Sequence, residues 1–146
     1  MKIKLVHYLL VVIQFGILGF FVINHFIIPS NLISILLLAD AVILGVWAVI
    51  SMNLNTISAL PDSRIHATLT KKGPYQWIRH PMYTSVLELA IALLVDYYSP
   101  LRLGLLLLLC LVLFLKMNIE EKILILKFPD YSDYISKTKR LIPWLY

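Results

Sequence analysis

Polar side chains gather in one short stretch between two very apolar parts of the chain. This stretch, residues 72–83, contains a Gly-Pro pair followed by an arginine, a histidine and a second proline. Glycine tolerates positive φ and the residue before proline avoids the α region, so Gly73-Pro74 predicts a turn. The proline after His80 suits the first position of a helix. Arg79 and His80 would then lie at the positive end of that helix, where an anionic group can dock.

A second polar cluster follows a long leucine run. Lys116, Glu120 and Glu121 belong to a stretch with no glycine or proline between residues 105 and 128. Lys116 and Glu120 are four residues apart and share one face of a helix. Taken alone, this cluster is typical of a snorkelling lysine and two solvated carboxylates, just as Arg79 and His80 alone are typical of headgroup anchors. On one membrane face, the two clusters together predict a pocket with both signs of charge.

The composition indicates a membrane protein. Of the 146 residues, 60% are hydrophobic and only 14% are charged, whereas a soluble domain carries about 25% charged residues. The net charge of +5 is best explained by membrane topology, because no basic patch is long enough to follow a nucleic-acid backbone. A single cysteine excludes disulfides and cysteine-based zinc sites. The four histidines lack ligand spacing, so we expect no metal.

Four apolar segments predict an all-α integral membrane protein with about four transmembrane helices. The predicted spans are residues 5–28, 32–52, 81–97 and 101–118. A span needs about 20 apolar residues, and the third segment is short. The first segment follows two lysines as a signal peptide would. It continues to residue 28 without a small-x-small cleavage site, which favours a retained helix. We expect one domain over residues 1–146.

The distribution of basic residues predicts the topology. The connections at residues 29–31 and 96–100 contain no Lys or Arg, whereas residues 53–80 and the tail after residue 115 contain ten. Positive residues mark the cytoplasmic side. Both termini, the loop and the active site are therefore predicted to be cytoplasmic. In the tail we expect a short amphipathic helix capped by Asp130, then an aromatic end that serves as a lid or anchor.

Two acidic residues lie within the predicted spans. Asp40 is in the second span and Glu88 is in the third. Intramembrane acids are costly and usually functional. Each lies several residues from the end of its helix, so the two are predicted to meet near the midplane and to share a proton.

The two polar clusters resemble those of a known family. Gly73-Pro74-Tyr75 followed by Arg79-His80-Pro81-Met82-Tyr83 is similar to the G-P-Y-x-x-x-R-H-P-x-Y signature of the isoprenylcysteine carboxyl methyltransferase family. Membrane phospholipid N-methyltransferases are similar there. The second family block combines paired glutamates, F-x-x-Y-x-x-Y and a terminal R-x-I-P. It is matched by Glu120-Glu121, Phe128, Tyr131, Tyr134 and Arg140-Leu141-Ile142-Pro143. The resemblance covers residues 68–146.

The resemblance implies an integral-membrane methyltransferase that uses S-adenosylmethionine at the cytoplasmic face. Residues 67–83 and 116–143 would form the cofactor-binding regions. The cofactor-binding residues implied by the motifs are Ala67, Thr68, Leu69, Thr70, Tyr75, His80, Pro81, Met82, Tyr83 and Glu120. The catalytic residues implied are Lys116, Arg79 and Glu121. The acceptor would be a lipophilic or lipidated molecule reached from the bilayer, and no nucleic acid is expected as a partner.

One position departs from the family pattern. Lys116 stands where the family usually has an arginine placed near the substrate carboxylate. Lysine keeps the charge but lacks the planar two-pronged geometry of arginine. Carboxylate O-methylation is the favoured reaction. A carboxylate is already ionised and needs no base, whereas an amine or thiol acceptor would need His80 or Glu121 as proton acceptor.

Other functions remain open at this point. Phospholipid N-methylation is the alternative within the same class of enzyme. A small four-helix transporter built around Glu88 is an alternative from another class, although it gives little reason for the connection at residues 53–80 or for the tail. A cofactor-binding protein without catalysis is a third alternative.

Overall fold

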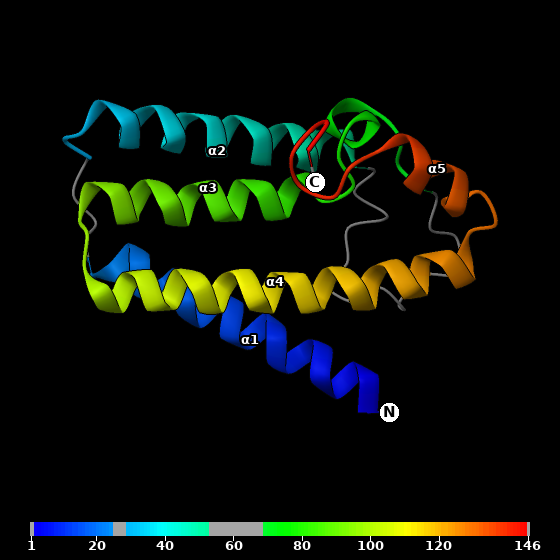
Figure 1. The fold of residues 1–146 in the computed structure, drawn as a ribbon, viewed down its shortest axis with the longest axis horizontal. Coiled ribbons are helices and arrows are strands. Elements are labelled where there is room, and N and C mark those ends of the chain that lie inside the picture. The colour runs from blue at the N-terminus through cyan, green and yellow to red at the C-terminus, as the bar shows by residue number, and fades with distance from the viewer. Residues whose placement is uncertain (1, 25–28, 53–68, 146) are drawn as a thin grey trace.

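The described part of the chain is entirely helical. The computed structural model describes residues 2–24, 29–52 and 69–145, and no strand occurs in these ranges. The elements are α1 (Lys2–Ile23), α2 (Leu32–Ser51), the 3-10 turn η1 (Gly73–Gln76), α3 (Pro81–Asp96), α4 (Pro100–Lys127) and α5 (Tyr131–Lys137). Helices α2, α3 and α4 lie side by side, and α1 crosses α4 obliquely (Figure 1). The predicted all-α fold class is confirmed.

Three of the described helices have the length and apolarity needed to cross a membrane. They are α1 from Leu5, α2, and α4. Helix α3 runs alongside α2 but has only 16 residues, fewer than the ~20 that a span usually needs. Many large apolar side chains on α1, α2 and α4 are exposed on the outside of the bundle, as contact with lipid requires. The fold is therefore that of an integral membrane protein.

The core lies where α1, α3 and α4 meet. Its buried residues are Ile17, Phe21, Ala90, Leu93, Leu94, Leu109 and Leu113. Helix α2 packs on α3 through small side chains instead. The Ser85 hydroxyl of α3 donates to the Ala41 carbonyl oxygen of α2 at 2.8 Å, and a Cβ added at Gly45 would lie 2.7 Å from the Ser85 Oγ. Small residues thus allow the two backbones to approach closely, as is common between membrane helices.

The end of the bundle opposite the termini is held by polar contacts between its two turns. The Asp96 Oδ1 accepts a hydrogen bond from the Ser30 backbone N–H at 2.9 Å. The Arg102 side chain is 2% exposed, and its Nη1 donates to the Leu93 carbonyl oxygen at 2.9 Å. Its guanidinium also lies over the Tyr97 ring, 5.1 Å from the centroid. A cation at the C-terminal end of α3 offsets the negative end of the helix dipole.

The two intramembrane acids lie together. Asp40 is near the middle of α2 and Glu88 is near the middle of α3, and the Asp40 carboxyl group is close enough to act on Glu88 electrostatically. Their predicted contact is therefore present in the structure, and the proton that they share stays a prediction.

The η1 turn depends on its first residue, which is a glycine. Gly73 has a φ of +58°, in the left-handed region that favours glycine. A Cβ at this position would lie 2.0 Å from the Ser51 Oγ and 2.8 Å from the Ser51 Cβ. Glycine therefore lets the turn pass directly against the end of α2, where the Tyr75 hydroxyl donates to the Met52 Sδ at 3.0 Å.

Replacing this glycine tests how strongly the turn depends on it. We expect Gly73→Ala to lower the free energy of unfolding by about 2 kcal/mol, since alanine is strained at positive φ. The close approach to the Ser51 Cβ adds to the cost, because rotating the serine hydroxyl does not move that carbon. The measurement is unfolding of the purified protein in mixed micelles.

Gly104→Ala is the matched control for this substitution. Nothing lies within 4 Å of a Cβ added at Gly104, and alanine is the better helix former, so this variant should be at least as stable as the wild type. Equal stability of the two variants would contradict the role given to Gly73.

Candidate active site

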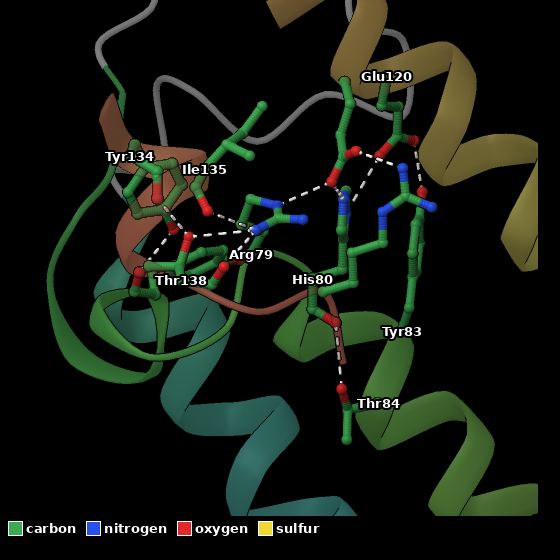
Figure 2. Close-up of polar contacts among 11 residues, drawn as sticks. Arg79, His80, Tyr83, Thr84, Glu120, Tyr134, Ile135 and Thr138 are labelled. Atoms are coloured by element: carbon green, nitrogen blue, oxygen red, sulfur yellow. Dashed lines mark hydrogen bonds and ion pairs between the residues drawn. The ribbon is translucent and has the colours of Figure 1, made fainter. Parts of the chain in front are cut away.

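The candidate site lies where the start of α3, the extension of α4 and the returning tail converge (Figure 2). Helix α4 has 28 residues, because no proline interrupts it after its first residue. It ends at Lys127, just before Phe128-Pro129. It therefore runs past the start of α3 and brings Glu120 and Glu121 beside His80. The two polar clusters predicted from the sequence are adjacent in the structure.

Glu121 joins three segments through one carboxylate. Its Oε1 accepts from the Arg79 Nε at 2.8 Å and lies 3.3 Å from the His80 Nε2, and its Oε2 accepts from the Arg140 Nη2 at 2.7 Å. The Glu121 side chain is 8% exposed. Two guanidinium groups thus surround one buried carboxylate, and charge-assisted hydrogen bonds of this kind are the strong ones.

The Arg79 side chain also holds the tail. Its Nη1 donates to the Thr138 carbonyl oxygen at 2.5 Å and to the Ile135 carbonyl oxygen at 3.3 Å. Figure 2 shows these contacts on the side of the guanidinium away from His80. Because Arg79 binds Glu121 and two tail carbonyls at once, most of its donors are occupied within the protein.

Backbone hydrogen bonds attach the tail to the segment before α3. The Lys139 N–H donates to the Trp77 carbonyl oxygen at 3.0 Å, the Arg79 N–H donates to the Lys139 carbonyl oxygen at 2.8 Å, and the His80 N–H donates to the Arg140 carbonyl oxygen at 3.0 Å. This short parallel pairing fixes the residues that precede α3. The tail is thus part of the site, although it is far from α3 in the sequence.

Glu120 lies beside His80 and Tyr83 on a more open wall of the site. Its Oε1 accepts from the Tyr83 hydroxyl, and its Oε2 lies 3.8 Å from the His80 Nδ1. The His80 and Tyr83 rings are stacked, with centroids 5.4 Å apart and planes within 2°. The Glu120 side chain is 20% exposed, and no arginine binds it in the part of the chain that the structure describes. Neighbouring carboxylates thus have different surroundings.

Lys116 lies one helical turn before Glu120 and is 5% exposed. Its Nζ donates to the Gln14 Oε1 at 2.6 Å and lies 4.9 Å from the centroid of the Tyr83 ring. Gln14 is on α1 and was not identified from the sequence. The signal that could have found it is an amide within an otherwise apolar span, a position where polar groups need partners.

The predicted residues of the first motif line one region. Pro81 begins α3 and is buried, and Met82 follows it half-buried. Tyr75 is buried in η1, and its carbonyl oxygen accepts from the Tyr134 hydroxyl at 2.5 Å. Burial raises the pKa of Tyr75 to about 12, so its phenol is neutral at physiological pH. These residues are placed near one another, and their contact with a cofactor stays a prediction.

Four of the predicted cofactor-binding residues come before η1 in the sequence. Leu69 and Thr70 are half-buried there, whereas the predicted cofactor-binding residues Ala67 and Thr68 lie outside the described residues. In the tail, α5 follows Asp130 as expected. The Asp130 side chain makes no capping hydrogen bond, so the expected side-chain cap is absent.

A model of the family described as "Isoprenylcysteine carboxyl methyltransferase (ICMT) family" matches residues 32–126 of the chain. The match covers α2, η1, α3 and nearly all of α4. It therefore includes both polar clusters, while α1 and α5 lie outside it. No curated protein and no solved structure matches the chain.

The two neighbouring glutamates allow a matched stability test. We expect Glu121→Gln to lower the free energy of unfolding by about 3 kcal/mol, because it leaves the buried Arg79 side chain and the half-buried Arg140 side chain without their shared anion. Glu120→Gln should cost only about 1 kcal/mol, since its hydrogen bond is to the uncharged Tyr83 hydroxyl, which can still donate to the amide oxygen. Unfolding in mixed micelles measures both. Equal losses for the two variants would show that Glu121 does not have the special structural role assigned here.

Proposed function

The chain belongs to the isoprenylcysteine carboxyl methyltransferase family, and we propose that it transfers a methyl group from S-adenosylmethionine to a lipophilic acceptor. Family membership makes it a membrane methyltransferase. Carboxylate O-methylation is the reaction we favour. The observation that carries the proposal is the convergence of Glu120, His80 and Tyr83 on one partly exposed wall.

The residues of this wall fit the proposed cofactor. When bound, S-adenosylmethionine supplies an activated methyl group on a sulfonium, together with an ammonium, a carboxylate and an adenine. The Glu120 carboxylate is 20% exposed and has no arginine contact among the described residues, so it can pair with the ammonium. The stacked His80 and Tyr83 rings offer apolar and aromatic surface. The N-terminal end of α3 carries partial positive charge suited to the carboxylate.

Arg79 and Glu121 lie next to this wall and hold His80 in place. They bind each other at 2.8 Å, and Glu121 also contacts His80 at 3.3 Å. We assign both to positioning: they fix the His80 ring and the start of α3. Methyl transfer is an in-line displacement, so its rate depends on how well the nucleophile, methyl carbon and sulfur are aligned. A rigid wall therefore serves the reaction directly.

Lys116 favours a carboxylate acceptor over an amine. It is a buried cation next to Tyr83, and a cation there attracts an anionic nucleophile and repels an ammonium group. A carboxylate acceptor also needs no general base, because it is ionised at neutral pH. For these two reasons we propose carboxylate O-methylation and keep phospholipid N-methylation as the alternative reaction.

The proposed location of the site is the cytoplasmic face. The N-terminus of α1, the C-terminal end of α4 and the tail lie at the same end of the bundle (Figure 1). The basic residues of the segment before α3, of the end of α4 and of the tail also lie at this end, and positive residues mark the cytoplasmic side.

Cofactor binding tests the wall assignment. We expect Glu120→Gln to weaken binding of S-adenosylmethionine about tenfold or more, because a charge-assisted hydrogen bond is lost. His80→Ala should weaken it similarly by removing the stacked ring. Calorimetric titration of the detergent-purified protein measures the affinity. Asp133→Asn, an exposed carboxylate on α5, is the control and should bind as the wild type does. Unchanged affinity in both site variants would refute the assignment.

Methyl transfer itself identifies the acceptor chemistry. The protein is incubated with methyl-labelled S-adenosylmethionine and total membrane lipid, or with ethanolamine phospholipid alone. A carboxyl methyl ester releases labelled methanol on mild alkaline hydrolysis, whereas an N-methyl headgroup keeps its label. We expect alkali-labile label from the total lipid and none in the ethanolamine phospholipid. Alkali-stable headgroup label would instead establish N-methylation.

A further inference from the structure

The Lys116 ammonium is buried and its direct contacts are with neutral groups, while the Glu120 carboxylate acts on it electrostatically. The residue is 5% exposed within α4, and its described contacts are the Gln14 amide oxygen and the face of the Tyr83 ring. None of the ion pairs in the described part of the chain includes it. Glu120 lies one turn further along, where it contacts Tyr83 and His80. Buried charges are normally paired, most of all within a membrane.

Gln14 presents a second donor beside this ammonium. It is 5% exposed and shares the buried stripe of α1 with Leu10, Ile17 and Phe21. Its Oε1 accepts from the Lys116 Nζ at 2.6 Å, and its amide nitrogen forms no hydrogen bond within the described residues. The oxygen and nitrogen of an amide are attached to the same carbon. The ammonium and the amide N–H₂ therefore lie next to each other, contributed by two different helices.

Two adjacent donors, one of them charged, match the two oxygens of a carboxylate. The same arrangement is unfavourable for an amine, which brings a second positive charge. Lys116 also lies on the face of Tyr83, whose hydroxyl contacts Glu120. An anion held by Lys116 and Gln14 would thus be on one side of Tyr83, with the proposed cofactor wall beside the same ring.

We propose that Gln14 and Lys116 together bind the carboxylate of the methyl acceptor, so that α1 determines acceptor specificity. Gln14 lies outside residues 32–126, the part of the chain that the family model matches. Helix α1 crosses α4 obliquely, and its N-terminal end stands apart from α2 and α3 (Figure 1). Methyl transfer to the bound carboxylate rests on the proposed function, whereas binding of the carboxylate does not.

Comparison of the wild type with two variants of Gln14 separates acceptor binding from a purely structural role. Gln14→Glu keeps an oxygen acceptor for Lys116 but adds a negative charge that repels a carboxylate ligand. Gln14→Met removes the amide at similar length. If Gln14 only satisfies Lys116, the methionine variant keeps the carboxylate affinity of the wild type, because the charge of Lys116 is unchanged. If Gln14 binds the acceptor, both variants lose carboxylate affinity while their binding of S-adenosylmethionine is unchanged.

The binding experiment titrates dodecanoate and dodecanol into each purified form in a neutral detergent. We expect the wild type to bind dodecanoate roughly tenfold or more tightly than dodecanol, as charge-assisted hydrogen bonds imply. In Gln14→Glu this preference should disappear. A wild type without the preference, or a glutamate variant that retains it, overturns the inference. Gln14→Met leaves the charge of Lys116 as it is, so a weakened preference in this variant supports the role of Gln14 itself, and a preference equal to that of the wild type overturns it.

The methyl-transfer assay separates this inference from the proposed function. With a carboxylate acceptor, Gln14→Glu should raise the KM for the acceptor about tenfold and leave the KM for S-adenosylmethionine unchanged. If the wild type prefers dodecanoate but transfers no methyl group, the proposed function fails and the carboxylate site stands. If it transfers methyl groups without the preference, the function stands and the carboxylate site fails.

Discussion

The buried carboxylate of Glu121 fixes the relation between three segments that are distant in the sequence. Arg79 and His80 come from the start of α3, Glu121 from the extension of α4, and Arg140 from the tail. Once taken out of water, these charges are stable only together. Glu120 and Tyr83 are neighbours of these residues along the same helices, so the network also sets the geometry of the open wall. The site is precise because its support is ionic and buried.

Adjacent glutamates perform different tasks because a helix turns about 100° per residue. Glu121 faces the arginines and is enclosed, whereas Glu120 faces Tyr83 and stays partly exposed. The sequence alone identified both carboxylates and both helices, since apolar runs, prolines and the two motifs are local signals. It did not reveal which carboxylate is enclosed, because that depends on Arg140, which reaches Glu121 only after the tail has folded back. The catalytic roles predicted for Arg79 and Glu121 stay predictions, and the positioning role is proposed from their contacts with each other and with His80.

The contacts of α1 were not identified from the sequence. The Gln14 amide in an apolar span indicates that a polar partner is needed there, but it does not indicate which residue that partner is. Its contact with Lys116 joins residues 102 positions apart. Arg102 is a similar case, because its buried guanidinium binds the carbonyl end of α3 instead of a headgroup. The third predicted span shows the opposite situation. Its limits were marked by Pro81 and Pro100, and α3 indeed lies between them.

The shortness of α3 has a consequence for the surrounding bilayer. Its 16 residues measure about 24 Å along the axis, against a hydrocarbon thickness of about 30 Å. Such a mismatch is relieved by local thinning of the lipid around the short helix. The leaflet surface then dips toward the start of α3, and headgroups sink to the level of the polar wall. An amphiphile anchored by its tail can present its head at that level without being lifted out of the leaflet.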